Sequence, residues 1–310
     1  VQDDIYLIHR DSVTTVDAAE AYFSSVDSLV AQHPDAGAYI SSLAGKNSRR
    51  LSSATLTDLT DSEDIVAGFS VPERSVNTNW VADRLANRIR STNCIEFRGG
   101  QFVVSALPID NEDGPWAVKT AEGSSETYDL VLNALWEGRL AVDAKAGLAM
   151  RNTWSNRYRV SLFVKTRVEV EAPSAVVAVG PFGDIKSYGS GSYYLSWYPS
   201  GLILTDDKVC PTAPELLQPR RDAVQDGVYE HLGSLVPAAR KVLDAADSII
   251  CEGGWVFAQA SGQLSDPEAT IHRRDRFGVV RRGAYLSIDT GKYSTAPTMA
   301  ETIVQTINEG

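Results

Sequence analysis

Residues 291–295, Gly-Lys-Tyr-Ser-Thr, are the stretch whose residue types and spacing best suit chemistry. Gly291 can adopt a positive φ or let a ligand approach the backbone closely. Pro297 fits the first turn of a helix, which then continues with the spacing of one buried face through Ala300, Ile303, Val304 and Ile307. Backbone N–H groups, a helix dipole and Lys292 would meet at its start, which suits an anion or an electron-rich ring edge. The simpler interpretation is a capped helix that packs on the core.

A second group of charged residues lies just upstream. Five arginines fall between positions 273 and 282, close to His272 and Asp275. Arginine forks suit carboxylate and phosphate groups, so this local basic cluster indicates an anion more clearly than the overall charge does. For any single arginine, a solvated position partly paired with Asp275 is the more ordinary interpretation.

Composition excludes several classes of function. The formal charge of -11 argues against a general nucleic-acid binder, and no apolar run is long enough to span a membrane. The first residues show no signal peptide. Cys94, Cys210 and Cys251 are widely spaced, and the four histidines form no paired pattern, so no metal site is expected. This cysteine usage favours a reducing, cytoplasmic compartment.

Residues 1–150 predict two different kinds of structure. A strand at 5–8 and a helix at 17–33, capped by Thr15 or Asp17, precede a loop-rich stretch at 34–64. From residue 73 the chain reads as α/β. We expect a helix after Asn77 with Val81, Leu85 and Ile89 on one face, a hairpin of strands 95–97 and 102–105 around Gly99-Gly100, and strands at 116–120 and 128–133. The last of these has the apolar run of a buried parallel strand, and ligands collect at the carboxyl ends of such strands.

Residues 151–250 predict an antiparallel sheet. Between Tyr158 and Val170 the even positions are mostly apolar and the odd ones include Arg159, Lys165 and Arg167, which is the alternation of a strand with one wet face. Further strands are expected at 174–179 and 193–198, a pocket-lining loop at 180–188, and a helical pair at 222–232 and 237–246.

These patterns together predict an α/β protein, α+β overall, with two interleaved domains. Residues 73–150 and 251–310 would form an α/β domain of the cofactor-binding type. Residues 1–72 and 151–250 would form a substrate or cap domain around the antiparallel sheet.

Four stretches, in this order, resemble FAD-dependent oxidoreductases of the D-amino-acid oxidase superfamily, which includes glycine and sarcosine oxidases. Residues 76–80 lead into a helix and hairpin. Residues 128–136 are similar to the family's strand that ends in Asn-Ala-Ala-Gly-Trp. Residues 272–278 are similar to its Arg-Pro-x-x-x-Asp-Gly, and residues 287–297 to its Gly-His-x-x-x-Gly-x-x-x-Ala-Pro before the last helix. The resemblance spans most of residues 73–310 and is diffuse.

The departures from the family's pattern are informative. Gly-x-Gly-x-x-Gly, which the family carries in an N-terminal βαβ unit that cradles the FAD diphosphate, is absent from all 310 residues. We therefore expect this chain to be the C-terminal part of a longer flavoprotein, with the missing N-terminal segment as its partner, or a degenerate member without FAD. Leu135 and Trp136 replace the family's Ala-Gly, which puts the cofactor contact at that loop in doubt.

The resemblance implies FAD as cofactor and a small amine or amino acid as substrate, whose C–N bond loses a hydride to the flavin. Lys292 would add positive charge beside the flavin or assist oxygen, and His272 or Arg273 would hold a substrate carboxylate. Residues that would meet the cofactor are Asn133, Ala134, Gly291, Tyr293, Ser294 and Thr295. Candidate walls of the substrate pocket are Tyr188, Tyr194 and Trp197, although ordinary packing is the commoner role of an aromatic side chain.

Two other functions remain open at this point. The first is a non-catalytic binding or scaffold protein that kept the fold and lost FAD. The second is a different α/β enzyme whose anionic ligand is bound by the arginine cluster. A flavin absorption spectrum in the purified full-length protein would separate both from an FAD-dependent oxidoreductase.

The missing dinucleotide fingerprint generates a prediction for the isolated chain. The 310 residues alone should bind FAD weakly or not at all, since no glycine-rich turn is present to hold the diphosphate. Fluorescence titration of the chain with FAD measures this. Submicromolar affinity would contradict the expectation and would require another diphosphate cradle.

Overall fold

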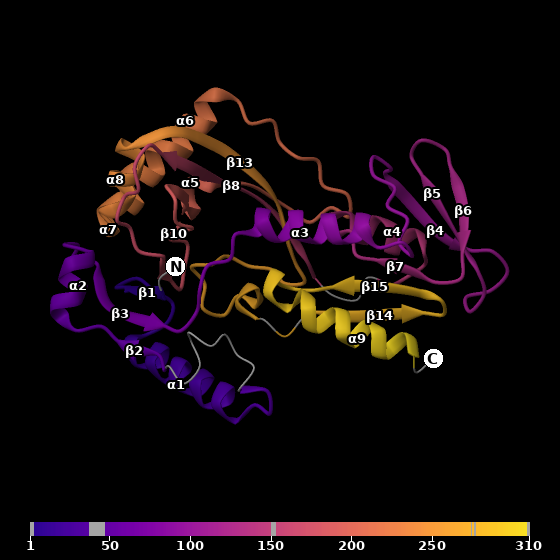
Figure 1. Cartoon of the computed structure of the whole chain (residues 1–310), viewed down its shortest axis with the longest axis horizontal. Coiled ribbons are helices and arrows are strands. Elements are labelled where there is room, and N and C mark those ends of the chain that lie inside the picture. The colour runs from indigo at the N-terminus through magenta and orange to yellow at the C-terminus, as the bar shows by residue number, and fades with distance from the viewer. Residues whose placement is uncertain (1–2, 37–46, 150–152, 274, 276, 309–310) are drawn as a thin grey trace.

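The computed structural model describes residues 3–36, 47–149, 153–273, 275 and 277–308. Within these residues the protein is a mixed α/β structure built on a nine-stranded sheet and two three-stranded sheets (Figure 1). The α/β class predicted from the sequence is therefore confirmed. No helix in the described ranges is long and apolar enough to cross a membrane.

The nine-stranded sheet joins the N-terminal block to the middle of the chain. Its order is β12-β8-β11-β10-β9-β1-β3-β2, and β13 also pairs with β8. Only β1 and β9 pair in parallel, and they connect the two parts of the sheet. Its strands are β1 (Asp4–His9), β2 (Arg49–Arg50), β3 (Ile65–Val71), β8 (Ser155–Thr166), β9 (Ala175–Ala178), β10 (Gly183–Ser187), β11 (Ser192–Trp197), β12 (Leu202–Asp206) and β13 (Ala246–Ala258).

One face of this sheet holds the main hydrophobic core. The alternation predicted for β8 puts Val160, Leu162 and Val164 on this face, where each is at most 2% exposed. Burial of each such side chain contributes about 1.5–3 kcal/mol relative to exposure. The helical pair predicted after residue 222 is present and covers the core. Its segments are α6 (Gln218–Gly227), the π-helical turn Val228–Leu232, α7 (Gly233–Leu235) and α8 (Ala238–Asp244), preceded by the short α5 (Tyr198–Gly201).

The N-terminal block carries two helices. α1 (Val16–Gln32) begins at Thr15, whose hydroxyl accepts a hydrogen bond from the Ala18 N–H at 3.2 Å, and it buries Phe23 in a small core with residues of β3. α2 (Ser53–Leu59) lies in the stretch predicted to be loop-rich. Residues 37–46 of that stretch lie outside the described residues.

The remaining elements form the second half of the molecule. β15 lies between β14 and β7, antiparallel to the first and parallel to the second, so residues far apart in the sequence share one sheet. A separate meander contains β4, β5 and β6. The elements are α3 (Thr78–Ser91), β4 (Val103–Pro108), β5 (Trp116–Thr120), β6 (Ser125–Tyr128), β7 (Val131–Asn133), α4 (Arg139–Lys145), β14 (Gly278–Arg282), β15 (Tyr285–Asp289) and α9 (Ala296–Asn308). The domain boundaries stay a prediction, and β13 continues through residue 250 to Ala258.

Two strand predictions in the second half are wrong in part. Residues 95–97 form no strand, so no hairpin forms around Gly99-Gly100. The stretch 128–133 is divided between β6 and β7, which lie in different sheets. β7 is parallel as expected, but Leu132 is 45% exposed, because no described segment covers this strand as parallel strands normally require.

Strand β10 occupies most of the segment 180–188, which the sequence predicted to be a loop. Gly183 reads as a turn signal, yet a Cβ at this position would meet the Ser196 backbone of the neighbouring strand β11. Glycine is needed here because two strands approach closely, and not because the chain turns.

Helices α3 and α9 form where the sequence predicted them, but α9 lacks the buried face that was predicted for it. In α9 only Met299 is buried, whereas Val304 and Ile307 are exposed. In α3 no residue is buried, although Val81, Leu85 and Ile89 share a face as expected. Periodicity located these helices, but it could not reveal how much of each apolar face is covered.

The close pairing of β13 with β8 predicts different effects for two adjacent glycines. A Cβ at Gly253 would lie against the Arg159 carbonyl oxygen, so Gly253→Ala should force the strands apart and lower the free energy of unfolding by about 1–3 kcal/mol. A Cβ at Gly254 meets no atom within 4 Å, so Gly254→Ala should change stability by less than about 1 kcal/mol. Urea unfolding measures both variants, and equal losses would contradict the close approach.

Candidate functional site

A buried arginine lies where α4 meets the end of β15. The Arg139 side chain is 4% exposed and pairs with Asp143 at 3.2 Å and with Asp289 at 3.1 Å. Asp143 lies one turn further along α4, and Asp289 is the last residue of β15. Because a buried charge is tolerated only when it is paired and hydrogen-bonded, these side chains hold α4 against the end of the strand.

Polar side chains complete this buried ion network. The hydroxyls of Ser287 and Tyr285 donate to Asp143 at 2.6 and 2.7 Å, and Arg139 Nη1 donates to Ser287 Oγ at 3.0 Å. The side-chain amide of Asn133 donates to Asp143 at 2.9 Å and to the Tyr285 hydroxyl at 2.7 Å. The network therefore ties β7, β15 and α4 together through side chains that are almost fully buried.

Burial sets the protonation of two members of the network. Burial raises the pKa of Asp289, while the charge of Arg139 and the N–H of Gly291 act in the opposite direction. Burial also raises the pKa of Tyr285, and its hydrogen bond to Asp143 raises that pKa further. Tyr285 therefore remains a neutral donor, whereas burial and the Arg139 charge act on the pKa of Asp289 in opposite directions.

Gly291 connects this network to the last helix. Its φ is 62°, and its N–H donates to Asp289 Oδ1 at 2.8 Å. A Cβ here would lie 2.9 Å from Phe277, so backbone conformation and packing both require glycine. Residues 293–295 form a 3-10 turn that continues into α9, so the first N–H groups of the helix follow Lys292. The turn has the form predicted from the sequence, apart from the partial burial of α9.

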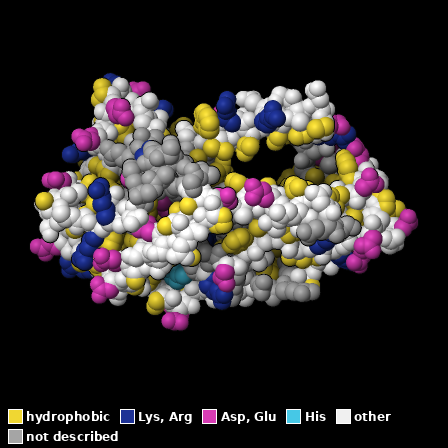
Figure 2. All heavy atoms as spheres, turned by 60° about the horizontal axis from the view of Figure 1, so that its bottom comes forward, with side chains coloured by type: hydrophobic (Ala, Val, Ile, Leu, Met, Phe, Trp, Pro, Cys, Tyr) yellow, Lys and Arg dark blue, Asp and Glu magenta, His cyan; other side chains and the backbone are white. Residues whose placement is uncertain are grey.

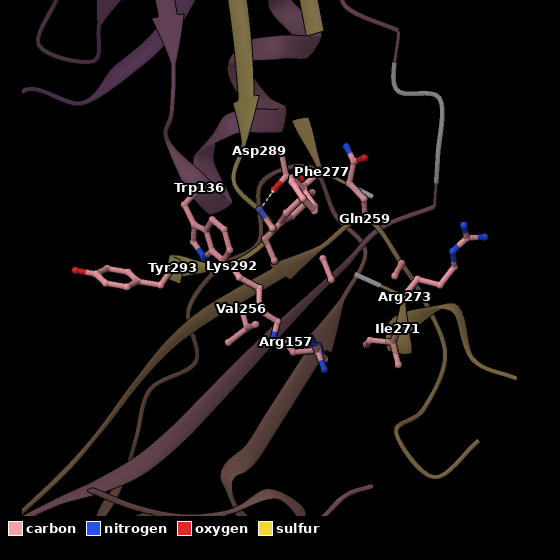
Figure 3. A pocket seen from close by; sticks show the side chains of 14 residues that line it. Trp136, Arg157, Val256, Gln259, Ile271, Arg273, Phe277, Asp289, Lys292 and Tyr293 are labelled. Carbon is pink, nitrogen blue, oxygen red and sulfur yellow. Dashed lines mark hydrogen bonds between the residues drawn. The ribbon is translucent and has the colours of Figure 1, made fainter. Parts of the chain in front are cut away.

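A cavity of about 280 Å³ lies beside this turn, between the two halves of the molecule. Figure 3 shows Lys292 and Tyr293 on one side and Arg157 of β8 with Val256 of β13 on the other. Both main sheets therefore contribute walls to one cavity. The remaining lining residues are Trp136, Phe257, Ala258, Gln259, Ala260, Ile271, Arg273, Phe277, Asp289 and Gly291.

Trp136 connects the two sides of the cavity. Its Nε1 donates to the Trp255 carbonyl of β13 at 3.0 Å, and its ring lies edge-on to Phe257 with centroids 6.3 Å apart. Its φ is 51°, in the left-handed region that favours glycine. The family pattern has glycine at this position. This chain keeps a backbone conformation that glycine adopts easily, but it carries an indole side chain that fills part of the cavity.

Arg157 is a candidate site residue that the sequence did not identify. Its Nη1 donates to the Tyr198 hydroxyl at 3.2 Å, whereas its Nε is buried and has no hydrogen-bond partner among the described residues. It lies on the face of β8 predicted to be wet. Sequence alternation could have pointed to it, because Arg157 shares a face of β8 with Arg159. In the structure this end of the face lies at the cavity that Asp289 and residues 291–293 also line.

The structure brings some of the predicted catalytic residues together. Gly291, Lys292, Tyr293 and Arg273 line the same cavity. The guanidinium of Arg273 pairs with Asp275, however, and extends away from the Trp136 side (Figure 3). His272 is not a lining residue, and its Nε2 lies 2.9 Å from the Asp266 carbonyl. Arg274 and Arg276 of the arginine cluster lie outside the described residues.

The other predicted site residues lie outside the cavity lining. Asn133 uses its side chain in the buried ion network, and Ala134 after it is exposed at the end of β7. Ser294 and Thr295 belong to the 3-10 turn next to the cavity. Their expected roles toward a cofactor stay predictions.

The three aromatic candidates do not share one surface. Trp197 faces the helix-covered core and stacks on His231 at 5.6 Å. Tyr194 points to the opposite face, where its hydroxyl lies 2.9 Å from Ser161 Oγ. Tyr188 lies two residues beyond Lys186 of β10, and burial raises its pKa to about 12. None of the three lines the cavity beside Gly291.

Comparison with known proteins identifies the fold. The sequence matches no protein-family model and no curated protein. The structure is similar to glycine oxidase from Geobacillus kaustophilus, with a TM-score of 0.61 and 12% identity over 93% of this chain. It is also similar to NikD, an amino acid oxidase of nikkomycin biosynthesis (TM-score 0.58, 12% identity, 96% of this chain), and to L-proline dehydrogenase from P. horikoshii (TM-score 0.58, 11% identity, 100% of this chain).

These comparisons confirm the predicted resemblance at the level of the fold. The chain has the fold of FAD-dependent oxidoreductases of the D-amino-acid oxidase superfamily. It covers 64% of the glycine oxidase chain, which is less than two thirds of that protein, 70% of NikD and 72% of the proline dehydrogenase.

The residues present fit one end of an FAD molecule. The Gly291 turn, the start of α9 and a cavity with the buried, unpartnered Arg157 Nε suit a flavin ring and an anionic substrate group. The diphosphate end is different, since no Gly-x-Gly-x-x-Gly occurs in the 310 residues. The residues present therefore fit the ring end of FAD and not its diphosphate end.

The buried ion network predicts a pH-dependent loss of stability in Arg139→Leu. Leucine leaves Asp143 and Asp289 buried without the arginine, which should cost about 3–5 kcal/mol at pH 7. The pKa of Asp289, already raised by burial, loses its main opposing charge. The folded variant then binds a proton at Asp289 more tightly than the unfolded chain does. An aspartate of the unfolded chain has a pKa of about 3.9. The stability from that proton is present below this pH and is lost as pH rises through the folded pKa.

Urea unfolding at pH 4.5 and pH 7 measures this difference. The loss in Arg139→Leu should be smaller at the lower pH. Arg167→Leu is the matched control, because that arginine is 81% exposed and should change stability by less than about 1 kcal/mol at either pH. If Arg139→Leu lost the same free energy of unfolding at both pH values, this would contradict a buried Asp289 carboxyl with a raised pKa.

Proposed function

We propose that this chain is the ring-binding and substrate-binding part of an FAD-dependent oxidoreductase that oxidises a C–N bond of an amine or amino acid. The observation that carries this proposal is the cavity that joins the Gly291 turn to Arg157 across two sheets. The same fold is found in an oxidase of glycine and a dehydrogenase of L-proline.

In this proposal the flavin accepts a hydride from the carbon next to the substrate nitrogen. The start of α9 presents its positive dipole end and N–H groups toward the ring edge, where they favour negative charge. Lys292 adds a cation at the same edge of the cavity. The walls from β13 and Trp136 exclude water from the reacting carbon.

Arg157 is assigned to the substrate carboxylate in this proposal. Its Nε is buried without a hydrogen-bond partner among the described residues, and an arginine fork binds a carboxylate through two parallel hydrogen bonds. Arg273, proposed for this role from the sequence, is paired with Asp275 and extends away from the Trp136 side of the cavity. We therefore propose that Arg157 orients the substrate and that Arg273 stays at the rim.

The diphosphate cradle is proposed to come from a segment of the same protein that lies outside these 310 residues. No such cradle occurs in the sequence, and the fold is matched over 64–73% of longer flavoprotein chains. We also propose a cytoplasmic protein, since Cys94, Cys210 and Cys251 are all unpaired thiols in the structure.

One observation favours a second candidate function, a binding protein that has lost FAD. The Trp136 indole lies in the cavity where the family pattern has glycine. An absorption spectrum decides between the two. The protein is expressed from its complete reading frame and purified, and flavin absorption bands that are retained after gel filtration support the oxidoreductase. A colourless protein that takes up no added FAD supports the binding protein.

Variants of the flavin-loaded protein test the two proposed roles. Arg157→Leu should raise KM for an amino-acid substrate roughly ten- to a hundred-fold, with a smaller effect on a substrate amine that lacks a carboxylate. Lys292→Met should slow flavin reduction or reoxidation and leave KM nearly unchanged, because it removes charge beside the ring. Stopped-flow absorbance and steady-state kinetics measure these effects.

Arg167→Leu is the control, since this arginine follows the same strand but is exposed and paired with Asp247. It should change neither quantity. Unchanged kinetics in Arg157→Leu would remove that arginine from the substrate site, and unchanged half-reactions in Lys292→Met would remove the lysine from the chemistry.

A further inference from the structure

Two neighbouring arginines on the polar face of β8 have few partners within the protein. Arg157 and Arg159 are two residues apart in one strand, so their side chains lie on the same face. Arg157 Nη1 donates to the Tyr198 hydroxyl at 3.2 Å, and Arg159 Nη2 donates to Ser196 Oγ at 3.4 Å. The Nε of each arginine is buried without a hydrogen-bond partner among the described residues. We call Arg157 and Arg159 the arginine pair, and most of its N–H donors are not used by the described part of the chain.

The arginine pair differs from the other described arginines that are not exposed. Each of those donates to a carboxylate or to two backbone carbonyls; they are Arg74, Arg139, Arg221, Arg240 and Arg282. Arg157 and Arg159 donate to one hydroxyl each, and neither pairs with a carboxylate within the ranges that the structure describes. A guanidinium that is partly removed from water is costly unless an anion pairs with it. The arginine pair therefore indicates an anion that comes from outside these residues.

Asp184 of β10 is a carboxylate on the same face of the sheet, but other groups engage it. Ser196 Oγ donates to Asp184, so a neutral hydroxyl lies between this carboxylate and Arg159. Burial raises the pKa of Asp184, and the hydrogen bond from Ser196 and then the charge of Lys186 oppose this shift more strongly than Arg159 does. Asp184 therefore belongs with Ser196 and Lys186, and the arginine pair is left without a direct carboxylate partner among the described residues.

Tyr198 holds the two guanidinium groups against one side chain. Its hydroxyl accepts the hydrogen bond from Arg157, and the Cζ of Arg159 lies 4.6 Å from the centroid of its ring. Tyr198 is 8% exposed and lies at the start of α5, so the surrounding packing fixes its position. Two like charges held around one ring repel each other, and an anionic ligand that reaches both relieves that repulsion.

Gly254 leaves open space beside Arg159. Val256 of β13 lies opposite Arg157 of β8, and both line the cavity beside Gly291 (Figure 3). The next pair of opposite residues on the same face is Gly254 and Arg159. Gly254 is exposed, and a Cβ at this position would meet no atom within 4 Å. The face therefore continues from the cavity wall to an unfilled position beside the second arginine, where a ligand can approach the strand closely.

We propose that the arginine pair binds two carboxylates of one substrate, which is therefore a dicarboxylic amino acid or a related amino dicarboxylate. Arg157 binds the carboxylate next to the reacting carbon, as in the proposed function. Arg159 binds a second carboxylate at the far end of the substrate, which lies over Gly254. This inference rests on the proposed function and names the substrate class that its site selects.

Glu252 sets the outer limit of this site. It is exposed and lies opposite Ser161, which is the next position on the same face after Arg159. A carboxylate carries one charge, which a single guanidinium neutralises, whereas a phosphoryl group carries nearly two charges and would lie close to Glu252. The position beside Arg159 therefore suits a carboxylate better than a phosphoryl group.

The protein surface offers an anion little general attraction. The formal charge of the chain is -11, and on the face shown in Figure 2 the lysine and arginine side chains are interspersed with acidic ones. Such a surface does not generate a positive field that gathers any anion. Selection of a dicarboxylate therefore depends on direct contacts with the arginine pair.

Binding of two matched carboxylates to the protein from the complete reading frame tests the proposal. Glutarate and pentanoate have the same carbon chain, and only glutarate has a second carboxylate. Calorimetric titration at physiological salt should give a Kd for glutarate at least about ten-fold below that for pentanoate, because charge-assisted hydrogen bonds to Arg159 are added. Equal affinities, or no binding of glutarate, would overturn the proposal. Tighter binding of inorganic phosphate than of glutarate would also overturn it, because the arginine pair would then be a phosphate site.

A substitution of the second arginine tests its role directly. Arg159→Gln should remove the preference for glutarate and change the Kd of pentanoate by less than about two-fold, because only the second carboxylate loses its partner. Arg167→Gln, at an 81% exposed arginine just after the same strand, is the control and should change neither Kd. A glutarate preference that survives in Arg159→Gln would remove this arginine from the site.

Substitutions at Gly254 give a second test that leaves both arginines in place. Gly254→Asp offers Arg159 a carboxylate of the protein itself and should weaken glutarate binding at least about ten-fold. Gly254→Asn has the same size without the charge and should have a smaller effect. These two variants decide the question if Arg159→Gln does not fold, since a side chain has room at this position. Equal glutarate affinities in the two variants would contradict a carboxylate site over Gly254.

These titrations measure binding and need no turnover of flavin. A protein that prefers glutarate through Arg159 and contains no flavin would support the dicarboxylate site and contradict the proposed oxidoreductase. A flavin-loaded protein that oxidises neutral amino acids and binds glutarate no more tightly than pentanoate would contradict the dicarboxylate site alone.

Discussion

The burial of Arg139 beside Asp143 and Asp289 is the constraint on which the geometry of the Gly291 turn depends. A guanidinium that is 4% exposed must keep both carboxylates in place, and Asp289 in turn accepts the N–H of Gly291. The position of the glycine turn, and therefore of the start of α9, is fixed through two hydrogen-bonded steps from α4, Arg139 to Asp289 and Asp289 to Gly291. The site thus takes its shape from a polar core and not from the apolar packing that holds the nine-stranded sheet.

The two halves of the molecule follow different physical rules. In β8 the alternating apolar residues pack against a complete set of helices, and the core is closed. In the half built on β7, β14 and β15, the polar network and a small apolar cluster around Trp116 are closed, but Leu132 and the apolar face of α3 are open. A segment can therefore be locally well determined by hydrogen bonds and still lack the burial that would make its half of the fold stable alone.

Sequence patterns predicted the elements better than their surroundings. The turn at Gly291 was recognisable because glycine, a following proline and helical periodicity agree, and β8 because its alternation is long. Leu132 was expected to lie in a buried strand and is exposed, since an apolar run does not reveal whether anything covers the strand. Leu85 shares a helix face with Val81 and Ile89 as expected, but periodicity could not show that this face is uncovered. Arg157 was missed for the same reason, because the strand pattern could not reveal that one end of its polar face meets the other half of the molecule. The buried ion network combines residues over 100 positions apart, and no local pattern encodes such a set.

The length of β13 has a consequence for how a ligand enters the cavity. This strand is continuous from the helix-covered core, where Cys251 is buried, to residues 256–258, which form one cavity wall. Moving that wall would break the pairing of β13 with β8, so it opens only with large-scale unfolding of the sheet. The opposite side is different, since Lys292 and Tyr293 are exposed and belong to a short turn. The Tyr293 side is therefore the side from which the cavity is reached most easily, and the residues of that turn set the width of its entrance.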